Sequence, residues 1–168
     1  MPRADRLLRV AARAGVGPIR RLALVGLFAM LAHASPAAAA CSVSVTGVAF
    51  GAYDTLSPAN DDSAGSLTAV CHPSDQSIEV LISGGSSGSV LARTMRNGAQ
   101  VLNYNLYTDA ARTSVWGDGS SGNTLTLNNG NVSSGQRTFS QPIYGRIPAL
   151  QAVGMGSYND TLVVTVVF

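Results

Sequence analysis

Hydrophobic and polar residues alternate along short segments of this chain. In residues 41–48 valines alternate with serines, and in residues 77–83 Ile78, Val80 and Ile82 fall on one side. Period-two alternation of this kind predicts strands with one buried face. It predicts roughly seven to nine strands, in segments that include residues 41–48, 65–71, 77–83, 101–108, 123–129, 136–147 and 157–168. No long segment with a helical period follows residue 40, so the pattern indicates an all-β domain.

Clusters of Gly, Ser, Asn and Asp separate these segments. Four of them are interpreted as turns between strands, at residues 83–89, 96–99, 117–123 and 128–131. Residues 56–65 and 148–156 are predicted to be loops, with Asp61 and Asp62 at a solvated loop tip. We find no internal repeat and no linker long enough to divide the chain. Turn signals spaced in this way favour a single antiparallel β-sandwich.

The final segment, residues 161–168, is apolar on both faces. One face carries Leu162, Val164, Val166 and Phe168, and the other carries Val163, Thr165 and Val167. An edge strand is normally protected by Lys, by Pro or by its short length, and this segment has no such protection. Its composition is that of an aggregation-prone strand. We therefore expect it to be covered, either by another strand of the same chain or by a strand from a different molecule.

The first 40 residues are interpreted as a secretory signal peptide. Six arginines precede a short apolar run at residues 22–32, and small residues lead to an Ala38-x-Ala40 cleavage site. This order is typical of signal peptides, and the apolar run is too short to span a bilayer comfortably. Cleavage after Ala34 fits as well, and an N-terminal membrane anchor is the alternative. The prediction is an exported chain without a stable membrane span, whose domain covers residues 41–168.

Removal of this leader reverses the sign of the net charge. The whole chain carries +2, whereas residues 41–168 keep five arginines and eight acidic residues, a net charge of −3. The sequence contains no lysine. Because such a chain offers no basic surface to phosphate groups, nucleic acid is not an expected partner.

Two cysteines, Cys41 and Cys71, remain after the leader. An even number of cysteines in an exported chain predicts a disulfide. In the chain-entropy model this bond would contribute roughly 3–4 kcal/mol to stability. Two unpaired thiols, or Cys71 as a nucleophile, are alternatives that an oxidising compartment disfavours.

Candidate catalytic and metal-binding groups are few. His72 is the single histidine after residue 40, and the sequence around it has no arrangement typical of a Ser-His-Asp triad. Residues 118–123 lack the spaced acids of a calcium loop. Glu79 and the aspartates form no pair suited to glycoside hydrolysis. We therefore predict no catalytic residue, no metal site and no cofactor.

Three aromatic residues could form a sugar-binding platform, namely Tyr104, Tyr107 and Trp116. Tyr104 alternates with Leu102 and Leu106, which favours a place in the core. Trp116 directly precedes a Gly-rich turn. Its sequence context fits either a core anchor or a surface-binding residue.

Four motifs follow one another in a specific order and spacing. They are "GVAFGAYD" at residues 47–54, "LTAVC" at 67–71, "LNYNLYTDAARTSVWGDG" at 102–119 and "IYGRIPALQAVGMGSYNDTLVVTVVF" at 143–168. Together they resemble the spore coat protein U domain family, which includes subunits of archaic chaperone–usher (Csu-type) pili. The resemblance spans essentially residues 41–168.

This resemblance implies an incomplete immunoglobulin-like antiparallel β-sandwich that lacks its last strand. A periplasmic chaperone would lend a strand in transit, and a neighbouring pilus subunit would replace it at the outer-membrane usher. The disulfide would tie the first strand to the next. A donor-strand groove would be lined by Val43, Val45, Leu162, Val164, Val166 and Phe168. The protein would then be a non-enzymatic structural or adhesive subunit that crosses the periplasm to the cell surface.

The sequence departs from a polymerising subunit ahead of Cys41. Cleavage after Ala40 leaves no N-terminal donor arm, and cleavage after Ala34 leaves only small residues. We therefore expect a strand acceptor at a terminal position, the tip of the fibre. Two alternatives stay open: a secreted spore-coat or extracellular matrix protein with a self-complete fold, and a carbohydrate-binding module or hydrolase.

Overall fold

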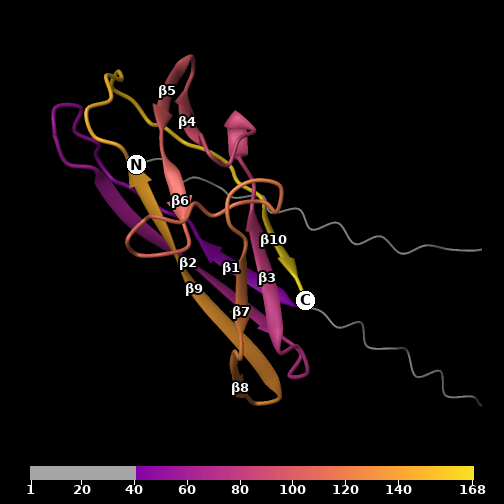
Figure 1. Cartoon of the computed structure of the whole chain (residues 1–168). Helices are drawn as coiled ribbons and strands as arrows, with labels where there is room; N and C mark the ends of the chain where they lie inside the picture. The colour runs from indigo at the N-terminus through magenta and orange to yellow at the C-terminus, as the bar shows by residue number, and fades with distance from the viewer. Residues whose placement is uncertain (1–40) are drawn as a thin grey trace, which may run out of the picture. The chain divides into compact units, whose positions relative to one another are not determined.

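The computed structural model describes residues 41–168 (Figure 1). Within this range the chain forms ten β-strands, one short 3₁₀ turn, η1 (Gly85–Ser87), and no α-helix. The strands are β1 (Ser42–Thr46), β2 (Asp61–Cys71), β3 (Ser77–Ile82), β4 (Thr94–Asn97), β5 (Gln100–Asn103), β6 (Asn105–Tyr107), β7 (Leu125–Asn128), β8 (Asn131–Ser133), β9 (Gln136–Ile147) and β10 (Val164–Val167). The predicted signal peptide, residues 1–40, lies outside the described residues. Residues 41–168 include no helix with the length and apolar character needed to cross a membrane.

The strands form two principal sheets and one separate hairpin. The first sheet has the order β1-β2-β9-β6, and β8 also pairs with β9. The second has the order β10-β3-β7, and β4 pairs with β5. Every pairing is antiparallel. Figure 1 shows the longest strands, β2 and β9, side by side, and they pair along the full 11 residues of β2.

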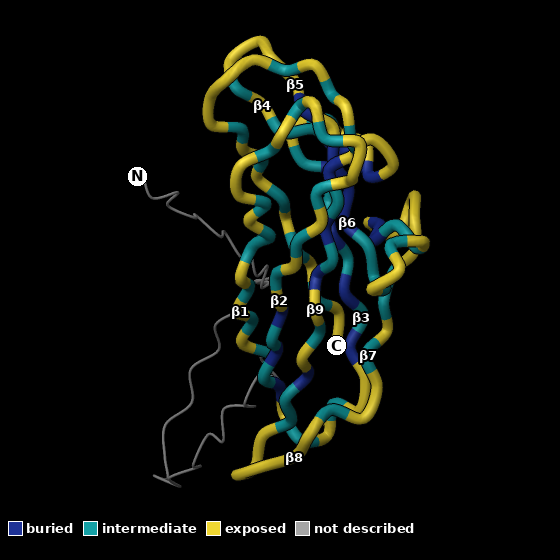
Figure 2. Tube along the Cα trace, turned by 90° about the vertical axis from the view of Figure 1, so that its left-hand side faces the viewer, coloured by how far each residue is buried: buried dark blue, intermediate teal, exposed yellow. Residues whose placement is uncertain are grey.

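Apolar side chains of both sheets meet in one core. The alternation in β3 places Ile78, Val80 and Ile82 inside, and in β2 it buries Leu67 and Ala69. Exposed residues gather in the connecting loops, while buried positions follow the strands (Figure 2). Side chains on alternate positions of a strand face opposite sides of the sheet, which explains this burial. The predicted all-β antiparallel architecture is confirmed.

Two expectations from the sequence need correction. The chain has more strands than expected, since β4, β5 and β8 are only three or four residues long. The predicted loop at residues 56–65 ends at Asn60, because β2 begins at Asp61 and pairs there with Ile147 of β9. The polar composition of this stretch hid its pairing.

Asp62 is thus a strand residue with ionic partners rather than part of a loop tip. Its carboxylate accepts a hydrogen bond from Arg146 Nε at 2.7 Å and lies 3.2 Å from Arg112 Nη1. The hydrogen bond from Arg146 lowers the pKa of Asp62 below its ordinary value, and the charge of Arg112 contributes to the same shift. Burial and the charge of Asp62 raise the pKa of Asp61.

Arg93 lies in the interior and is 0% exposed. Its guanidinium has five N–H donors, and it donates to five oxygen atoms at 2.7–3.3 Å: the carbonyls of Ile82, Ser83, Val90 and Trp116, and Asn105 Oδ1. All of these acceptors are uncharged. The acceptors lie in four parts of the chain, so Arg93 joins the end of β3 to β6 and to the loops before β4 and after β6.

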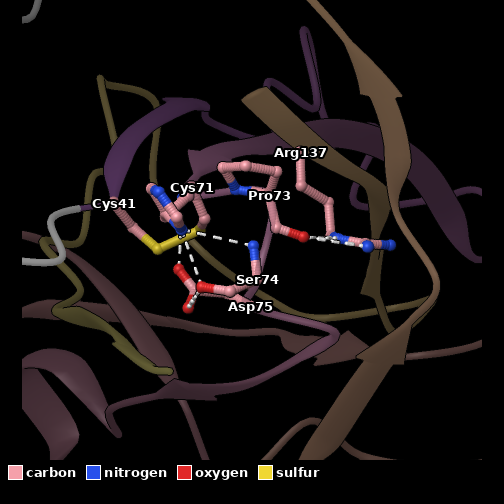
Figure 3. The surroundings of a disulfide bond; sticks show 7 residues. Cys41, Cys71, Pro73, Ser74, Asp75 and Arg137 are labelled. Atoms are coloured by element: carbon pink, nitrogen blue, oxygen red, sulfur yellow. Dashed lines mark hydrogen bonds between the residues drawn. A yellow bond between two sulfur atoms is a disulfide. The ribbon is translucent and has the colours of Figure 1, made fainter. Parts of the chain in front are cut away.

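The predicted disulfide is present between Cys41 and Cys71, with a Cα–Cα distance of 4.2 Å (Figure 3). It connects β1 to β2, one position beyond the last pair of their ladder, Ser42↔Val70. Arg137 of β9 supports the same corner, because its Nε and Nη2 atoms donate to the carbonyl of Pro73 at 3.2 and 3.0 Å. The bond therefore fastens the first strand at one end of its sheet.

Candidate functional site

The candidate site lies where both sheets end, at β1 and at β10. β1 is a terminal strand of the first sheet, and β10 is a terminal strand of the second. In Figure 2, β1 lies at the left margin of its layer, and the C-terminus, just beyond β10, lies to the left of β3 and β7. Among residues 41–168, no strand pairs with the outer edge of β10.

The hydrogen bonds next to β10 show which of its backbone groups face that outer edge. The carbonyl of Val163 accepts from the N–H of Ser83 at 3.0 Å, so Val163 faces β3. In an antiparallel ladder successive residues point their backbone groups alternately to one side and the other. Thr165, opposite Leu81, therefore also faces β3. The N–H and C=O groups of Val164 and Val166 point to the outer edge.

A row of inward-facing side chains runs along this terminal segment. Its members are Tyr158, Asp160, Leu162, Val164 and Val166, and each is half-buried, whereas the residues between them are exposed. The four uncharged members pack against the core. Phe168 does not continue the pattern, since it is 54% exposed. We call these five residues the inward row.

A second apolar row follows the chain from β1 into the loop after it. Val43, Val45, Val48 and Phe50 are half-buried and pack against the same core. Val48 and Phe50 lie directly over Gly145 of β9, where an added Cβ would come within 2.7 Å of both side chains. The glycine at this position therefore allows the loop to approach the sheet closely.

Between the two rows, at the end away from the disulfide, lies a cavity of about 680 Å³. One wall is formed by residues 48–55 and the other by residues 153–158. Met95, Leu102 and Ile147 also line it. A cavity of this size is in the range of sites that hold a small molecule or several side chains. We call it the cleft.

Hydrogen bonds hold the two tyrosines at the cleft in place. Tyr158 Oη donates to Gln100 Oε1 at 2.6 Å, and the same oxygen accepts from the N–H of Gly154 at 2.6 Å. Tyr53 Oη donates to the carbonyl of Pro148 and accepts from the N–H of Gln151, both at 2.8 Å. The walls of the cleft are thus fixed by contacts between segments that are distant in the sequence.

Tyr104 connects the two sides of the site from within the core. Its ring lies edge-on to Phe50, with centroids 6.1 Å apart, and its hydroxyl donates to Asp160 Oδ2 at 2.7 Å. Tyr104 is 6% exposed. Burial, together with the hydrogen bond to Asp160, raises the pKa of Tyr104 far above its ordinary value, so the hydroxyl keeps its proton and remains a donor.

Trp116 is not available for surface binding. It is 0% exposed, and its indole Nε1 donates to the carbonyl of Val80 at 2.9 Å. The surface-binding role predicted as one option is therefore wrong. The Gly-rich turn that follows does not bring the ring to the surface, because the backbone of Trp116 bonds to the carbonyl of Leu106 beside the core.

The polar groups near the disulfide stabilise a turn. The N–H of His72 donates to Asp75 Oδ2 at 3.1 Å, and His72 Nδ1 is hydrogen-bonded to Ser74 Oγ at 2.7 Å. Figure 3 shows Ser74 and Asp75 beside the two cysteines. The sulfurs and the Asp75 carboxylate lie within 4.8 Å of one another. Because the sulfurs are joined in the disulfide, they are not thiolate ligands for a metal.

Comparison with known proteins identifies the family. The family model described as the Spore Coat Protein U domain matches residues 27–165. This chain belongs to the Spore Coat Protein U domain family. The resemblance read from the four sequence motifs is thereby confirmed.

Two known proteins are similar to this chain, one in sequence and one in structure. Protein U of Myxococcus xanthus is 40% identical over 86 residues, which cover 50% of this chain and 45% of that protein. A chain in the crystal structure of the CsuC–CsuE chaperone–tip adhesion subunit pre-assembly complex, from the archaic chaperone–usher Csu pili of Acinetobacter baumannii, matches with a TM-score of 0.53. That match has 18% identity and covers 77% of this chain and 40% of the other. This chain therefore spans less than half the length of either, and the second likeness shows the immunoglobulin-like fold.

The site contains residues that the alternation pattern did not single out. Asp160 belongs to the inward row although it is charged, and Phe50, Tyr53 and Tyr158 line the cleft from loops. The sequence feature that could have indicated these residues is their place in the family motifs at residues 47–54 and 143–168. Loops lack a fixed side-chain period, so their inward residues could not be found by periodicity.

Proposed function

We propose that this protein is an exported, non-enzymatic subunit of a surface pilus that accepts a β-strand from another molecule. The observation that carries the proposal is the outer edge of β10, where Val164 and Val166 present backbone groups beside a half-buried apolar row. An extended segment could add to this edge through main-chain hydrogen bonds. Its alternate apolar side chains would cover the row and set the register.

The comparisons support this assignment and suggest the partners. A similar solved structure contains a chaperone together with a tip adhesion subunit of a chaperone–usher pilus. By analogy, we propose that a periplasmic chaperone, an outer-membrane usher and a neighbouring pilus subunit are the partners. In this scheme β10, with Val164 and Val166, forms one side of the donor-strand groove, and β1, with Val43 and Val45, forms the other.

The place in the fibre is a further part of the proposal. A mature chain that starts at Cys41 or Ser35 would carry no apolar donor arm, and it would then act as an acceptor at the tip. N-terminal sequencing of the exported protein measures this directly. A mature start well upstream of Ser35, with an apolar arm, contradicts the tip position.

A matched pair of substitutions in β10 tests strand acceptance. Val166 faces inward and is half-buried, whereas the adjacent Thr165 is exposed on the other face. We expect Val166→Lys to lower co-purification with the periplasmic chaperone at least ~10-fold, since a charge would have to be buried beneath the donated strand. Thr165→Lys should leave co-purification within about twofold of the parent, because its side chain points away from the strand's apolar face.

The result that contradicts the proposal is equal recovery of the chaperone with both variants. Circular dichroism and the melting temperature of each variant serve as controls for folding. A loss of chaperone with both variants, at unchanged melting temperatures, would also contradict it, because the effect would not depend on the inward face.

The second candidate is a spore-coat or matrix protein with a self-complete fold, which the family description, Spore Coat Protein U domain, suggests. Such a protein differs from a strand acceptor in one measurable property. A self-complete protein should be a stable soluble monomer when produced without a chaperone, whereas a strand acceptor should be recovered in lower yield and should aggregate as its concentration rises. Size-exclusion chromatography of periplasmic extracts, with and without the chaperone, distinguishes the two.

A further inference from the structure

Asp160 is the one charged member of the inward row. It stands between Tyr158, which lines the cleft, and Leu162, which packs on the core. Its Oδ1 atom accepts from the N–H of Ser86 at 2.8 Å and from its neighbour Thr161 at 2.9 Å. Its Oδ2 atom accepts the hydroxyl of Tyr104 at 2.7 Å. The carboxylate therefore sits at the junction of the cleft and the apolar row that continues along β10.

The surroundings of Asp160 leave little room for displacement. A Cβ added at Gly85 would collide with the carboxylate, and Gly85 has a φ of +62°, a conformation that favours glycine. The backbone next to Asp160 is held on the other side, where the N–H and C=O of Asn159 bond to Arg96 of β4 at 3.2 and 2.9 Å. The Asp160 side chain thus joins η1 to the terminal segment, and the adjacent backbone of Asn159 joins that segment to β4.

Tyr104 reaches this junction from the opposite side of the core. Its backbone N–H donates to the carbonyl of Arg93 at 3.0 Å, which anchors it within the interior. Its ring contacts Phe50 on the wall after β1, and its hydroxyl bonds to Asp160, two residues beyond the end of the other wall. One side chain therefore connects the two walls through the core.

We propose that Tyr104 and Asp160 form a positioning pair that holds the two walls at the spacing an incoming strand requires. The inference rests on the proposed strand-acceptor function. In this role the pair does not touch the donated strand through its polar atoms. The pair acts indirectly, by fixing the positions of Phe50 and of residues 158–162. The position of residues 158–162 relative to β3 and β4 decides whether the outer edge of β10 can pair with an incoming strand.

The test uses the full chain with an added C-terminal strand. A short Asn-Gly turn after Phe168 is followed by eleven residues of alternating Val and Ser, which can fold back along β10. The reference carries Pro in place of every Val, so it cannot pair. We expect the Val-Ser extension to raise the melting temperature by more than ~10 °C over the Pro reference, because several valines become buried.

The same difference is then measured in variants of the pair. Tyr104→Phe removes only the hydroxyl and should reduce the gain from the extension by about 4 °C, the scale of one lost hydrogen bond. Asp160→Ala breaks the same bond and also the bonds from Ser86 and Thr161, so it should reduce the gain by at least as much. The double variant should reduce the gain no further than Asp160→Ala alone, since Tyr104→Phe removes only a bond that Asp160→Ala already breaks. Tyr144→Phe, on β9 and opposite Ala64 in the ladder, should keep the full gain.

The outcomes separate this inference from the function on which it rests. If the parent gains nothing from the Val-Ser extension, strand acceptance itself is contradicted. A gain in the parent that is equal in Tyr104→Phe and Asp160→Ala overturns the positioning role, even where these variants lower the melting temperature of every form alike. If Tyr104→Phe does not fold, Asp160→Ala against Tyr144→Phe decides the question alone.

Discussion

At the scale of single residues, the interior holds a buried cation, Arg93, whose hydrogen-bond acceptors are all uncharged. Arg93 uses all five donors on neutral oxygens, which lie at the end of β3, in β6 and in the loops before β4 and after β6. A buried charge is tolerated when its hydrogen bonds are satisfied. The charge of Arg93 thus holds the end of β3 against the loops around Trp116 and Val90.

Removal of this side chain should destabilise the fold severely. Arg93→Met keeps the length of the side chain but removes five hydrogen bonds to buried oxygens, and we expect the free energy of unfolding to fall by ~3 kcal/mol or more. Arg96→Met is the matched control, since Arg96 is exposed, and it should change stability by at most ~0.5 kcal/mol. Urea denaturation of both variants measures the difference, and equal losses would contradict the role of Arg93.

The Asp62 ion pairs predict a specific dependence of stability on pH. Because the folded-state pKa of Asp62 lies below its unfolded value of about 3.8, its ionised form stabilises the fold above that pH. This contribution is lost as the pH falls through the lowered folded-state pKa. The side chain is 34% exposed, so the effect should be at most ~1 kcal/mol.

We therefore expect Asp62→Asn to lower the free energy of unfolding at pH 6 and to flatten its decrease below pH 4. Arg146→Gln should produce a similar change, because it removes the first cause of the shift. Denaturant titrations between pH 2 and pH 6 provide the measurement. A parent and an Asp62→Asn variant with parallel pH curves would show that these ion pairs do not contribute.

Among the strands, those with clear alternation could be predicted from the sequence and the others could not. The second half of β2 was predicted as a strand, and for β3 the inward side with Ile78, Val80 and Ile82 was predicted correctly as well. The first half of β2 is polar, and only its pairing with β9 makes it a strand. The short strands β4, β5 and β8 depend on tertiary contacts in the same way, since three or four residues carry too little pattern.

The candidate site, too, could be predicted only in part from the sequence. Val164 and Val166 were found because the terminal segment lacks the protection expected of an edge. The cleft was not found, because its walls are loops that approach each other only in the folded chain. The burial of Trp116 could not be decided either, since an aromatic residue before a Gly-rich turn fits both a core and a surface position.

The disulfide stabilises the element at the other terminus of the domain. Cys41 and Cys71 are 30 positions apart, and replacing both by Ser should lower the free energy of unfolding by roughly 3–4 kcal/mol in the chain-entropy model. Complete reduction of the parent should give the same value within error. If the double variant were as stable as the oxidised parent, β1 would be held by its ladder and core contacts alone.

For the molecule as a whole, these features describe a β-sandwich in which the outer edge of β10 is unpaired within residues 41–168. The core closes around Trp116 and Arg93, while the terminal strands carry half-buried apolar rows and a cleft of about 680 Å³ at one end. The chain belongs to the Spore Coat Protein U domain family, and it shares its fold with a chain of a chaperone–subunit complex that is 18% identical. The proposal of strand acceptance rests on the outer edge of β10.

Residue-resolved hydrogen exchange along β10 measures whether its outer edge is unpaired in the free protein. In the free monomer the amides of Val164 and Val166, which face the outer edge, should exchange at least ~100-fold faster than the amide of Thr165, which faces β3. On binding of the chaperone all three should be protected alike. If Val164 and Val166 are as protected as Thr165 in the free monomer, the chain covers its own edge and does not accept a strand there.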